Sequence, residues 1–391
     1  MDFATAQQHL RKLGVDAWLL YDFRGSNPIF WHVLGGKKHS TRRNMLMIPR
    51  RGEPKLLVHP VDADLFKDME IAIERYVSWP QLHEQIARLL RDSPRIAMEY
   101  SPEAAIPIVS CVDAGTIELI RNMGIEVISS GDLFQAVAAT WDAEALESHL
   151  AANRLVDQAK DAAFRFVGQS IAAGKSINEY DVQQFLMGEF GRAKLITNDP
   201  PIVGVNANSG NPHYQPTAAQ SSPIGRGDWV LIDLWAKLPG ERNVYADITW
   251  TGFVGDAPSA GHQEVFAIVL RARDAAVRRL QDAWRAGEQL EGWQVDQAAR
   301  TVIEQAGYGK HFFHRTGHSM GPGDEVHALG VNLDDLETHD TRKIIPGVGF
   351  SVEPGIYLPE FGVRSEINVF IDPQKGPTVT SSLQERIVCV G

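Results

Sequence analysis

Two patterns of apolar residues alternate along the first third of the chain and predict its elements. Short apolar runs of strand length recur, and stretches with helical spacing lie between several of them. The strand-like runs are residues 16–21, 45–48, 55–59, 95–100 and 125–129, and the helical stretches are residues 3–13, 61–69, 81–91 and 109–122. Strands that alternate with helices are typical of α/β domains. We therefore expect residues 1–135 to form a small N-terminal α/β domain.

A different pattern begins near residue 140. Long amphipathic helices are followed by β-prone segments, and this order occurs twice. The helical stretches are residues 143–172, 177–192, 263–284 and 293–305. The β-prone segments are residues 201–206, 228–235 and 245–254 in the first half, and residues 348–358 and 362–371 in the second. We expect residues 136–391 to form an α+β domain in which two related halves pack face to face.

The composition indicates a globular protein with an excess of acidic groups. An apolar content of 44% and a charged content of 22% are typical of that class, and a formal net charge of -11 argues against a nucleic-acid-binding surface. No apolar run approaches the ~20 residues of a membrane span, and no signal-peptide pattern is visible. Cys111 and Cys389 lie in apolar stretches, and we interpret them as reduced, buried thiols. We expect a cytoplasmic protein that binds neither nucleic acid nor membranes.

Each predicted hairpin carries two carboxylates inside its apolar segments. Asp233 and Asp247 lie in the first hairpin, and Glu353 and Glu366 lie in the second. An unpaired carboxylate in a buried strand costs several kcal/mol, so these residues either face water or meet cations. If the two halves pack together, the four carboxylates would repel one another. A divalent metal is the simplest way to neutralise them.

Four histidines near glycines or carboxylates offer nitrogen ligands. They are His213, His314, His318 and His327. A single histidine is most often structural, but four in such surroundings favour a metal site. Mostly oxygen ligands with one imidazole suit Mn²⁺, Co²⁺ or Fe²⁺, with Zn²⁺ as a further candidate, and the separated cysteines exclude a thiolate zinc site. Two metals that share carboxylates would hold and acidify a water molecule for hydrolysis.

In this order along the chain, Asp233, Asp247, His318, Glu353 and Glu366 resemble the dinuclear metal set of the pita-bread metallopeptidases. That family includes methionine aminopeptidase, aminopeptidase P and proline dipeptidase (prolidase). The resemblance covers roughly residues 140–391. The preceding domain is similar to the N-terminal domain of aminopeptidase P, prolidase and creatinase, which most methionine aminopeptidases lack. The resemblance therefore implies a C-terminal pita-bread catalytic domain behind a creatinase/prolidase-type α/β domain.

The resemblance also implies a role for each metal ligand. Two divalent ions would bind per chain, with Mn or Co expected first and Zn or Fe as alternatives. Asp233 would chelate one ion, and Asp247 and Glu366 would bridge both. His318 and Glu353 would complete the other ion, and Glu353 would also shuttle the proton of the metal-bridging hydroxide.

Four further residues match positions around the metals in the resembled family. His213, His314 and His327 correspond to outer histidines that orient the substrate and stabilise the tetrahedral intermediate. Arg364, in a Gly-x-Arg-x-Glu motif, would steady a bridging carboxylate or the substrate.

The implied activity is hydrolysis of the peptide bond that precedes proline. We expect an Xaa-Pro dipeptidase acting on small peptides, and the resemblance suggests a homodimer. Aminopeptidase P activity on longer peptides is the near alternative. A creatinase-like small-molecule hydrolase is a further alternative, although creatinase lacks the full ligand set. A non-catalytic binding module of the same fold would typically have lost ligands.

Three segments depart from the family pattern and concern the substrate. Residues 238–241 lengthen the spacing between Asp233 and Asp247, and residues 320–325 lengthen the spacing from His318 to His327. Residues 328–331 are apolar or glycine where many prolidases carry an arginine for the substrate carboxylate.

A basic cluster in the N-terminal domain could replace that arginine. It comprises Lys37, Lys38, His39, Arg42 and Arg43. A solvated loop is the simplest interpretation and an anion site is the alternative. We hypothesise that Arg42 or Arg43 reaches the active site, in its own chain or across a dimer, and holds the substrate carboxylate.

Overall fold

The computed structural model describes residues 3–391 and divides into two compact units, Met1–Ala138 and Ala139–Gly391. The first unit contains a six-stranded mixed sheet with the order β4-β3-β2-β1-β5-β6. Its strands are β1 (Ala17–Phe23), β2 (Arg43–Pro49), β3 (Lys55–Val58), β4 (Ala72–Arg75), β5 (Arg95–Met98) and β6 (Glu126–Ser129). Its helices are α1 (Phe3–Leu13), α2 (Pro28–Val33), α3 (Trp79–Leu89), α4 (Ala114–Asn122) and α5 (Gly131–Ala138). The predicted α/β class is confirmed.

Two details of this unit differ from the prediction. Residues 61–69 form only a short 3₁₀ turn, Ala63–Phe66, because the Asp62 carboxylate accepts backbone N–H groups of Thr41 and Arg42 and makes no helix cap. The predicted helix 109–122 begins at Ala114, where the side chain of Asp113 accepts the Thr116 N–H.

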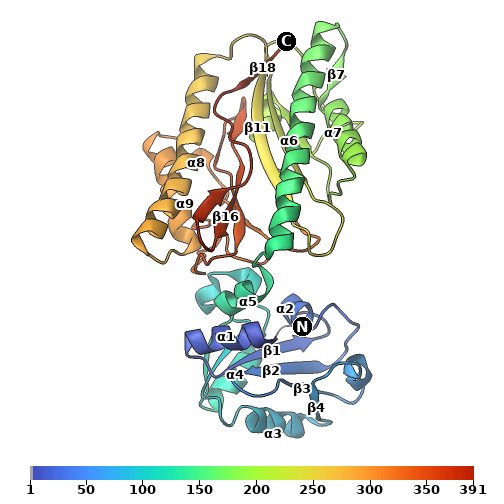
Figure 1. Ribbon diagram of the computed structural model, residues 1–391, viewed down its shortest axis with the longest axis vertical. Helices are drawn as coiled ribbons and strands as arrows, with labels where there is room; N and C mark the ends of the chain where they lie inside the picture. The colour runs from blue at the N-terminus through green and yellow to red at the C-terminus, as the bar shows by residue number, and fades with distance from the viewer. Residues whose placement is uncertain (1–2) are drawn as a thin grey trace. The chain divides into compact units, whose positions relative to one another are not determined.

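The second unit repeats one arrangement of helices and strands. Its helices are α6 (Ala143–Ala172), α7 (Glu179–Ala193), α8 (Ala260–Ala286) and α9 (Gly292–Gln305). One sheet has the order β18-β11-β10-β8, with β8 (Ile202–Val205), β10 (Trp229–Ala236), β11 (Ala246–Val254) and β18 (Val388–Val390). The other has the order β12-β13-β16-β17, with β12 (Ser319–Met320), β13 (Gly349–Val352), β16 (Ile367–Asp372) and β17 (Gly376–Val379). In Figure 1, β11 and β16 lie between the α6–α7 pair and the α8–α9 pair.

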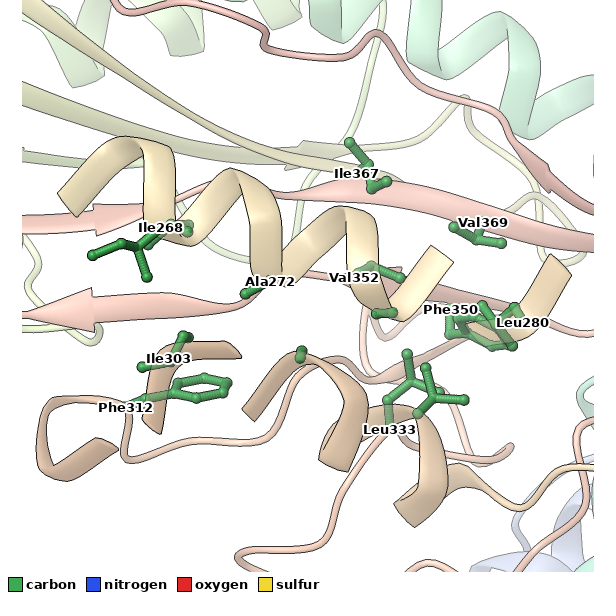
Figure 2. Close-up of a cluster of buried hydrophobic side chains, with 14 of the residues drawn as sticks. Ile268, Ala272, Leu280, Ile303, Phe312, Leu333, Phe350, Val352, Ile367 and Val369 are labelled. Atoms are coloured by element: carbon green, nitrogen blue, oxygen red, sulfur yellow. The ribbon is translucent and has the colours of Figure 1, made fainter. Parts of the chain in front are cut away.

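Each helix pair shares an apolar core with its own sheet. The α8–α9 core includes Ile268 and Ala272 from α8 and meets Phe350 from β13 and Ile367 and Val369 from β16, as Figure 2 shows. A second core joins α6 and α7 to β8, β10 and β11. Full burial of each large apolar side chain stabilises the fold by roughly 1.5–3 kcal/mol. The predicted architecture of two similar halves is therefore confirmed.

The second predicted hairpin is broken at its carboxylates. Its strands separate into the ladder of β13 with β16 and a short ladder of β14 (Gly355–Tyr357) with β15 (Gly362–Arg364). Between the ladders, the Glu353 N–H donates to the Thr316 carbonyl at 2.7 Å and the Glu366 N–H to the Thr249 carbonyl at 3.2 Å. Pro354 has no N–H to continue the pairing. Both glutamates therefore lie where the backbone changes partners, and not in strand interiors as predicted.

An asparagine joins the sheets of the two halves. Asn368 on β16 accepts the Asp247 N–H through Oδ1 at 3.1 Å and donates through Nδ2 to the Asp247 carbonyl at 2.6 Å. The side-chain amide thus forms the two hydrogen bonds with the N–H and carbonyl groups of Asp247 that the backbone of a neighbouring strand would otherwise form. This fixes Asp247 next to the broken hairpin that carries Glu353 and Glu366.

The cysteines differ from the prediction. Both are free thiols, but Cys111 is partly exposed and Cys389 is exposed, so the expectation of burial is wrong. Cys389 lies on the edge strand β18, where successive side chains point to opposite faces. Among the described residues, no helix combines the length and the apolar character that a membrane crossing requires.

Candidate active site

A cavity of about 910 Å³ opens in the second unit, and both of its halves line it. The lining includes every site residue predicted for this unit: Asp233, Asp247, His318, Glu353, Glu366, His213, His314, His327 and Arg364. Residues more than 150 positions apart in the sequence thus come together in one concave site. Arg42 and Arg43 lie in the other unit.

The centre of the cavity gathers carboxylates around one imidazole. Asp247, His318 and Glu366 are buried, and each offers a ligand atom within 4.8 Å of the others. Nε2 of His318 lies 3.2 Å from Oδ2 of Asp247 and 3.7 Å from Oε1 of Glu353. Asp247 comes from β11, His318 directly precedes β12, and Glu353 and Glu366 come from the two breaks in the hairpin. The geometry therefore unites four of the five predicted ligands.

The protonation of His318 tests whether these residues suit a metal. Its Nδ1 lies 3.1 Å from the Ser319 carbonyl, so this nitrogen donates a proton and Nε2 carries a lone pair. Burial lowers the pKa of His318, which keeps the ring neutral. A lone pair then faces carboxylate oxygens that also carry lone pairs. Two atoms bound to one ion at typical N/O distances lie roughly 3.0–3.4 Å apart, which matches the spacing to Asp247. The donor set fits a divalent cation.

The acidity of the carboxylates leads to the same conclusion. Burial raises the pKa of Asp247 to about 7 and that of Asp233 to about 6. Burial, followed by the charges of the other carboxylates, raises the pKa of Glu366 far above its usual range. Burial also raises the pKa of Glu353. A buried group of acids with so little compensating charge is stabilised by a bound cation.

Asp233 is the predicted ligand that pairs most closely with an arginine; Oε2 of Glu353 lies 3.8 Å from Nε of the same arginine, Arg364. The Asp233 carboxylate forms a short ion pair with Nη2 of Arg364, while Arg364 Nε donates to Oγ1 of Thr249 at 2.9 Å. Arg364 therefore steadies a carboxylate, but the structure pairs it with Asp233 and not with the expected bridging residue Glu366. Thr249 Oγ1 also lies 2.7 Å from Oε2 of Glu366 and 3.1 Å from Oδ1 of Asp233. This threonine connects the two carboxylates.

The three outer histidines occupy different environments. His314 donates from Nδ1 to the Arg315 carbonyl at 2.6 Å, and its Nε2 accepts the Tyr357 hydroxyl at 2.7 Å. Burial lowers the pKa of His314 to about 3, so it is a neutral acceptor here. His327 is exposed at the cavity and lies against His318, with ring centroids 4.0 Å apart. His213 is also exposed, on a loop after β8.

One buried lysine joins the two segments that lengthen the family spacing. Nζ of Lys237 donates to the carbonyls of Gly240 and Gly323, at 3.1 and 2.5 Å, and to Oδ1 of Asp324 at 3.0 Å. This buried ammonium group ties residues 238–241 to residues 320–325. Glu325, the last residue of the second segment, lines the cavity, as does Trp235, which lies two residues before Lys237. The second insertion thus forms part of the cavity wall, and Lys237 ties the first insertion to it.

Three residues that contact or neighbour the predicted site residues were not predicted from the sequence. Thr249 follows Asp247 by two positions, so both side chains point to the same face of β11. Tyr357 lies in the same β-prone segment as Glu353, and its hydroxyl accepts from Arg364 Nη1 at 3.2 Å. Spacing on the strands could have indicated both residues. Arg315 lies beside His314 in the sequence, and its adjacency to a predicted site residue was the available signal.

Arg42 and Arg43 are exposed in the first unit. Nη1 of Arg42 donates within its own loop, to the carbonyl and the hydroxyl of Thr41 at 3.2 Å each. Arg43 is exposed at the start of β2. Binding of the substrate carboxylate by either arginine stays a prediction.

An α+β domain of two similar halves, with carboxylates and one imidazole in a cavity that both halves line, has the architecture of a pita-bread metallopeptidase. Residues 147–373 match the model of metallopeptidase family M24, and the chain belongs to this family. The expected resemblance is confirmed.

Relatives and solved structures agree with this assignment. The Xaa-Pro dipeptidase of Pyrococcus furiosus is 32% identical over 219 residues, which are 56% of this chain and 57% of that protein. The chain thus matches little more than half the length of this relative. Dipeptidase PepE from Mycobacterium ulcerans has a TM-score of 0.67 at 22% identity, covering 99% of this chain and 96% of the other.

A second solved structure is X-prolyl aminopeptidase from Caenorhabditis elegans, described as a cytosolic enzyme with a di-nuclear active site. Its TM-score is 0.64 at 16% identity, covering 99% of this chain and 62% of the other. At these identities, both structural matches establish the fold.

Proposed function

We propose that this metallopeptidase hydrolyses the peptide bond preceding proline and acts as an Xaa-Pro dipeptidase. The observation that carries the proposal is the neutral His318, whose Nε2 lone pair faces the carboxylates of Asp247 and Glu353 inside one cavity. A divalent cation bound between these groups would satisfy the imidazole and the carboxylates together. The name of the Pyrococcus furiosus relative supports proline specificity.

Five residues would hold two divalent ions. The closest donor atoms belong to Asp247, His318, Glu353 and Glu366. Asp233 would be the fifth ligand, with its carboxylate bound both to an ion and to the guanidinium group of Arg364. Mn or Co suits this mainly oxygen donor set, with Fe or Zn as alternatives. When bound, such ions polarise the scissile carbonyl and lower the pKa of water.

Glu353 is the residue that would accept a proton from water and return it to the leaving nitrogen. Oε1 of Glu353 accepts from the Ser351 hydroxyl at 3.1 Å, and burial raises the pKa of Glu353. A raised pKa brings a carboxylate closer to the proton affinity that a general base needs near neutral pH. His213 and His327, exposed at the cavity, would orient the substrate by hydrogen bonding to its polar groups. His314 would act through Tyr357 by fixing the hydroxyl beside Arg364.

Aminopeptidase P activity on longer peptides is the second candidate. A cavity of about 910 Å³ lies near the upper end of the ~300–1,000 Å³ range of ordinary ligand sites, so its size does not restrict the substrate to a dipeptide. The structural match to an X-prolyl aminopeptidase favours the same alternative. A homodimer in the cytoplasm remains the expected setting for either activity.

The test combines metal analysis with a substrate panel. The purified protein, loaded with Mn²⁺ or Co²⁺, should bind two ions and cleave Xaa-Pro faster than Xaa-Pro-Xaa or dipeptides without proline. Asp247→Asn should lose at least one ion. Full activity in a metal-free preparation would refute the proposal, and a preference for tripeptides would replace the dipeptidase by aminopeptidase P.

A variant of Glu353 tests the proton transfer. Glu353→Gln should lower turnover by roughly 10²-fold, the scale of a lost general base. Its metal content is measured in the same preparation because Glu353 is also a candidate ligand. Glu360→Gln, at an exposed glutamate outside the cavity lining, is the matched control and should leave turnover unchanged. A metal-loaded Glu353→Gln variant with the parent's turnover contradicts the assigned role.

A further inference from the structure

The cavity contains two permanent cations. Among the lining residues of the described chain, the only lysine or arginine side chains are those of Arg315 and Arg364. A dipeptide that ends in proline has its free carboxylate directly after the cleaved bond. A dipeptidase therefore needs a cation close to its metal ligands, and these two arginines are the candidates on the cavity wall.

Arg364 is already engaged by the protein. The residue is buried, and each of its three side-chain nitrogens has a partner: Nη2 pairs with Asp233, Nε with Thr249 and Nη1 with Tyr357. Removal of a charged hydrogen bond from a buried partner is costly, because the partner is then left unsatisfied. Arg364 is therefore buried with its charge paired to Asp233, and it mainly orients groups of the protein.

Arg315 has a fixed backbone and an uncommitted guanidinium group. Its N–H donates to Oε1 of Glu337 at 3.3 Å, and its carbonyl accepts Nδ1 of His314 at 2.6 Å. The next residue, Thr316, donates its N–H to Oδ1 of Asp296 at 2.8 Å. Within the described residues, no hydrogen bond or ion pair engages the guanidinium, and the side chain is partly exposed at the cavity.

The position of Arg315 brings its charge to the centre of the site. It lies three residues before His318, and its side chain lines the same cavity as His314, His318 and His327. A positive charge on the wall of this cavity is within electrostatic reach of an anionic substrate bound in it.

The main competing interpretation is that Arg315 neutralises the acidic side chains beside it. Glu325 and Glu337 also line the cavity. Neither forms an ion pair with Arg315 within 4.0 Å in the described chain, and Glu337 already accepts the Arg315 N–H. The guanidinium therefore remains available for a ligand.

We propose that Arg315 binds the C-terminal carboxylate of the Xaa-Pro substrate. This rests on the proposed function and identifies the residue that determines its preference for dipeptides. Arg315 takes the role for which residues 328–331 offer no cationic side chain, and it competes with our prediction that Arg42 or Arg43 performs this role. The planar guanidinium can donate two parallel hydrogen bonds to a carboxylate, which neither a lysine nor a neutral side chain can do.

The test measures binding and turnover separately. The binding probe is an Ala-Pro analogue whose scissile amide is reduced to a methyleneamine, prepared with a C-terminal carboxylate or carboxamide. Calorimetry on the metal-loaded parent should give about 10- to 100-fold tighter binding of the carboxylate form, the effect of a charged hydrogen bond. Arg315→Ala should abolish this preference and leave the affinity for the carboxamide within about threefold. Arg315→Lys, which keeps the charge, should retain part of it.

Kinetics on cleavable substrates provides the second readout. Arg315→Ala should lower kcat/KM on Ala-Pro by about 10- to 100-fold and change kcat/KM on Ala-Pro-amide little. The double variant Arg42→Ala, Arg43→Ala tests the competing N-terminal loop and should keep the preference for the carboxylate if Arg315 binds it. Metal content, measured for every variant, detects damage to the ligand set.

The outcomes separate this inference from the proposed function. Equal affinity of the parent for the two analogues, a preserved preference in Arg315→Ala, or an equal loss on both substrates would each overturn the role of Arg315. A preference lost only in the Arg42, Arg43 double variant would overturn it in favour of the N-terminal loop. If the Arg315-dependent preference holds but Ala-Pro is not cleaved, the carboxylate subsite stands and the proposed function fails.

Discussion

A methyl group added at Gly210 should displace the loop that carries His213. Gly210 ends a 3₁₀ turn, Asn206–Gly210, and packs against the main chain just after β14. A Cβ atom built there would lie 2.5 Å from the Leu358 carbonyl oxygen, which is 0.9 Å less than the 3.4 Å at which ordinary contacts begin. The φ angle of Gly210 is not positive, so the effect of Gly210→Ala is steric.

Neither side of this contact can yield freely. Leu358 directly follows the ladder of β14 with β15, and Oγ of Ser209 accepts the Gly362 N–H at 2.8 Å. Overpacking of this kind costs about 1–3 kcal/mol of stability. A shift of about 1 Å in a substrate-positioning residue lowers catalytic efficiency by up to ~10²-fold, so kcat/KM on Xaa-Pro should fall by up to that factor.

Three measurements test this prediction: urea unfolding reports the loss of stability, kcat/KM reports the displacement of His213, and metal content reports the state of the ligand set. Gly210→Ala should be destabilised and less active yet keep the parent's metal content, because Asp247, His318 and Glu366 lie on other elements. Gly191→Ala is the matched control: it lies in α7, and an added Cβ meets nothing within 4 Å. It should be neutral or up to about 1 kcal/mol more stable. Parent-like stability and activity of Gly210→Ala would refute the steric argument.

Two further variants test buried carboxylates. Burial raises the pKa of Glu99 from 4.5 to about 7, so its contribution to stability is complete below pH 4.5 and is lost as the pH rises through 7. Between pH 5 and 8 the parent should therefore lose about 2.5 kcal/mol relative to Glu99→Gln in urea unfolding, and parallel pH profiles would contradict this. Glu179 accepts the N–H groups of Val205 and Ser222, the Asn208 amide and the Tyr214 hydroxyl. Glu179→Gln should lose about 2–5 kcal/mol by leaving buried donors unsatisfied, with faster hydrogen exchange across residues 205–222; unchanged exchange there would contradict its anchoring role.

Local periodicity was sufficient for the long helices and for the repeated pattern of the second unit. The predicted helices at residues 3–13 and 143–172 have the same bounds in the structure, as α1 and α6. Their apolar spacing and end signals involve residues within a few turns of each other. The strand β4 was missed because it has only four residues, Ala72–Arg75, none of them is buried, and two of them, Glu74 and Arg75, are charged.

The four strand carboxylates and the histidines were also identifiable from the sequence, because acidic residues in apolar β-prone segments are unusual. The order of these residues carried the resemblance to a metallopeptidase. The sequence alone thus determined the protein class and which side chains to examine.

Tertiary structure alone decided how those side chains are used. The hairpin breaks at Glu353 and Glu366 because their backbone N–H groups bond to Thr316 and Thr249, which are distant in sequence. The same kind of long-range contact commits Arg364 to Asp233, 131 residues away, and leaves Arg315 as the uncommitted cation of the cavity. Residue types and spacing record which groups can bond, but the choice among competing partners depends on distances that only packing of the two halves sets.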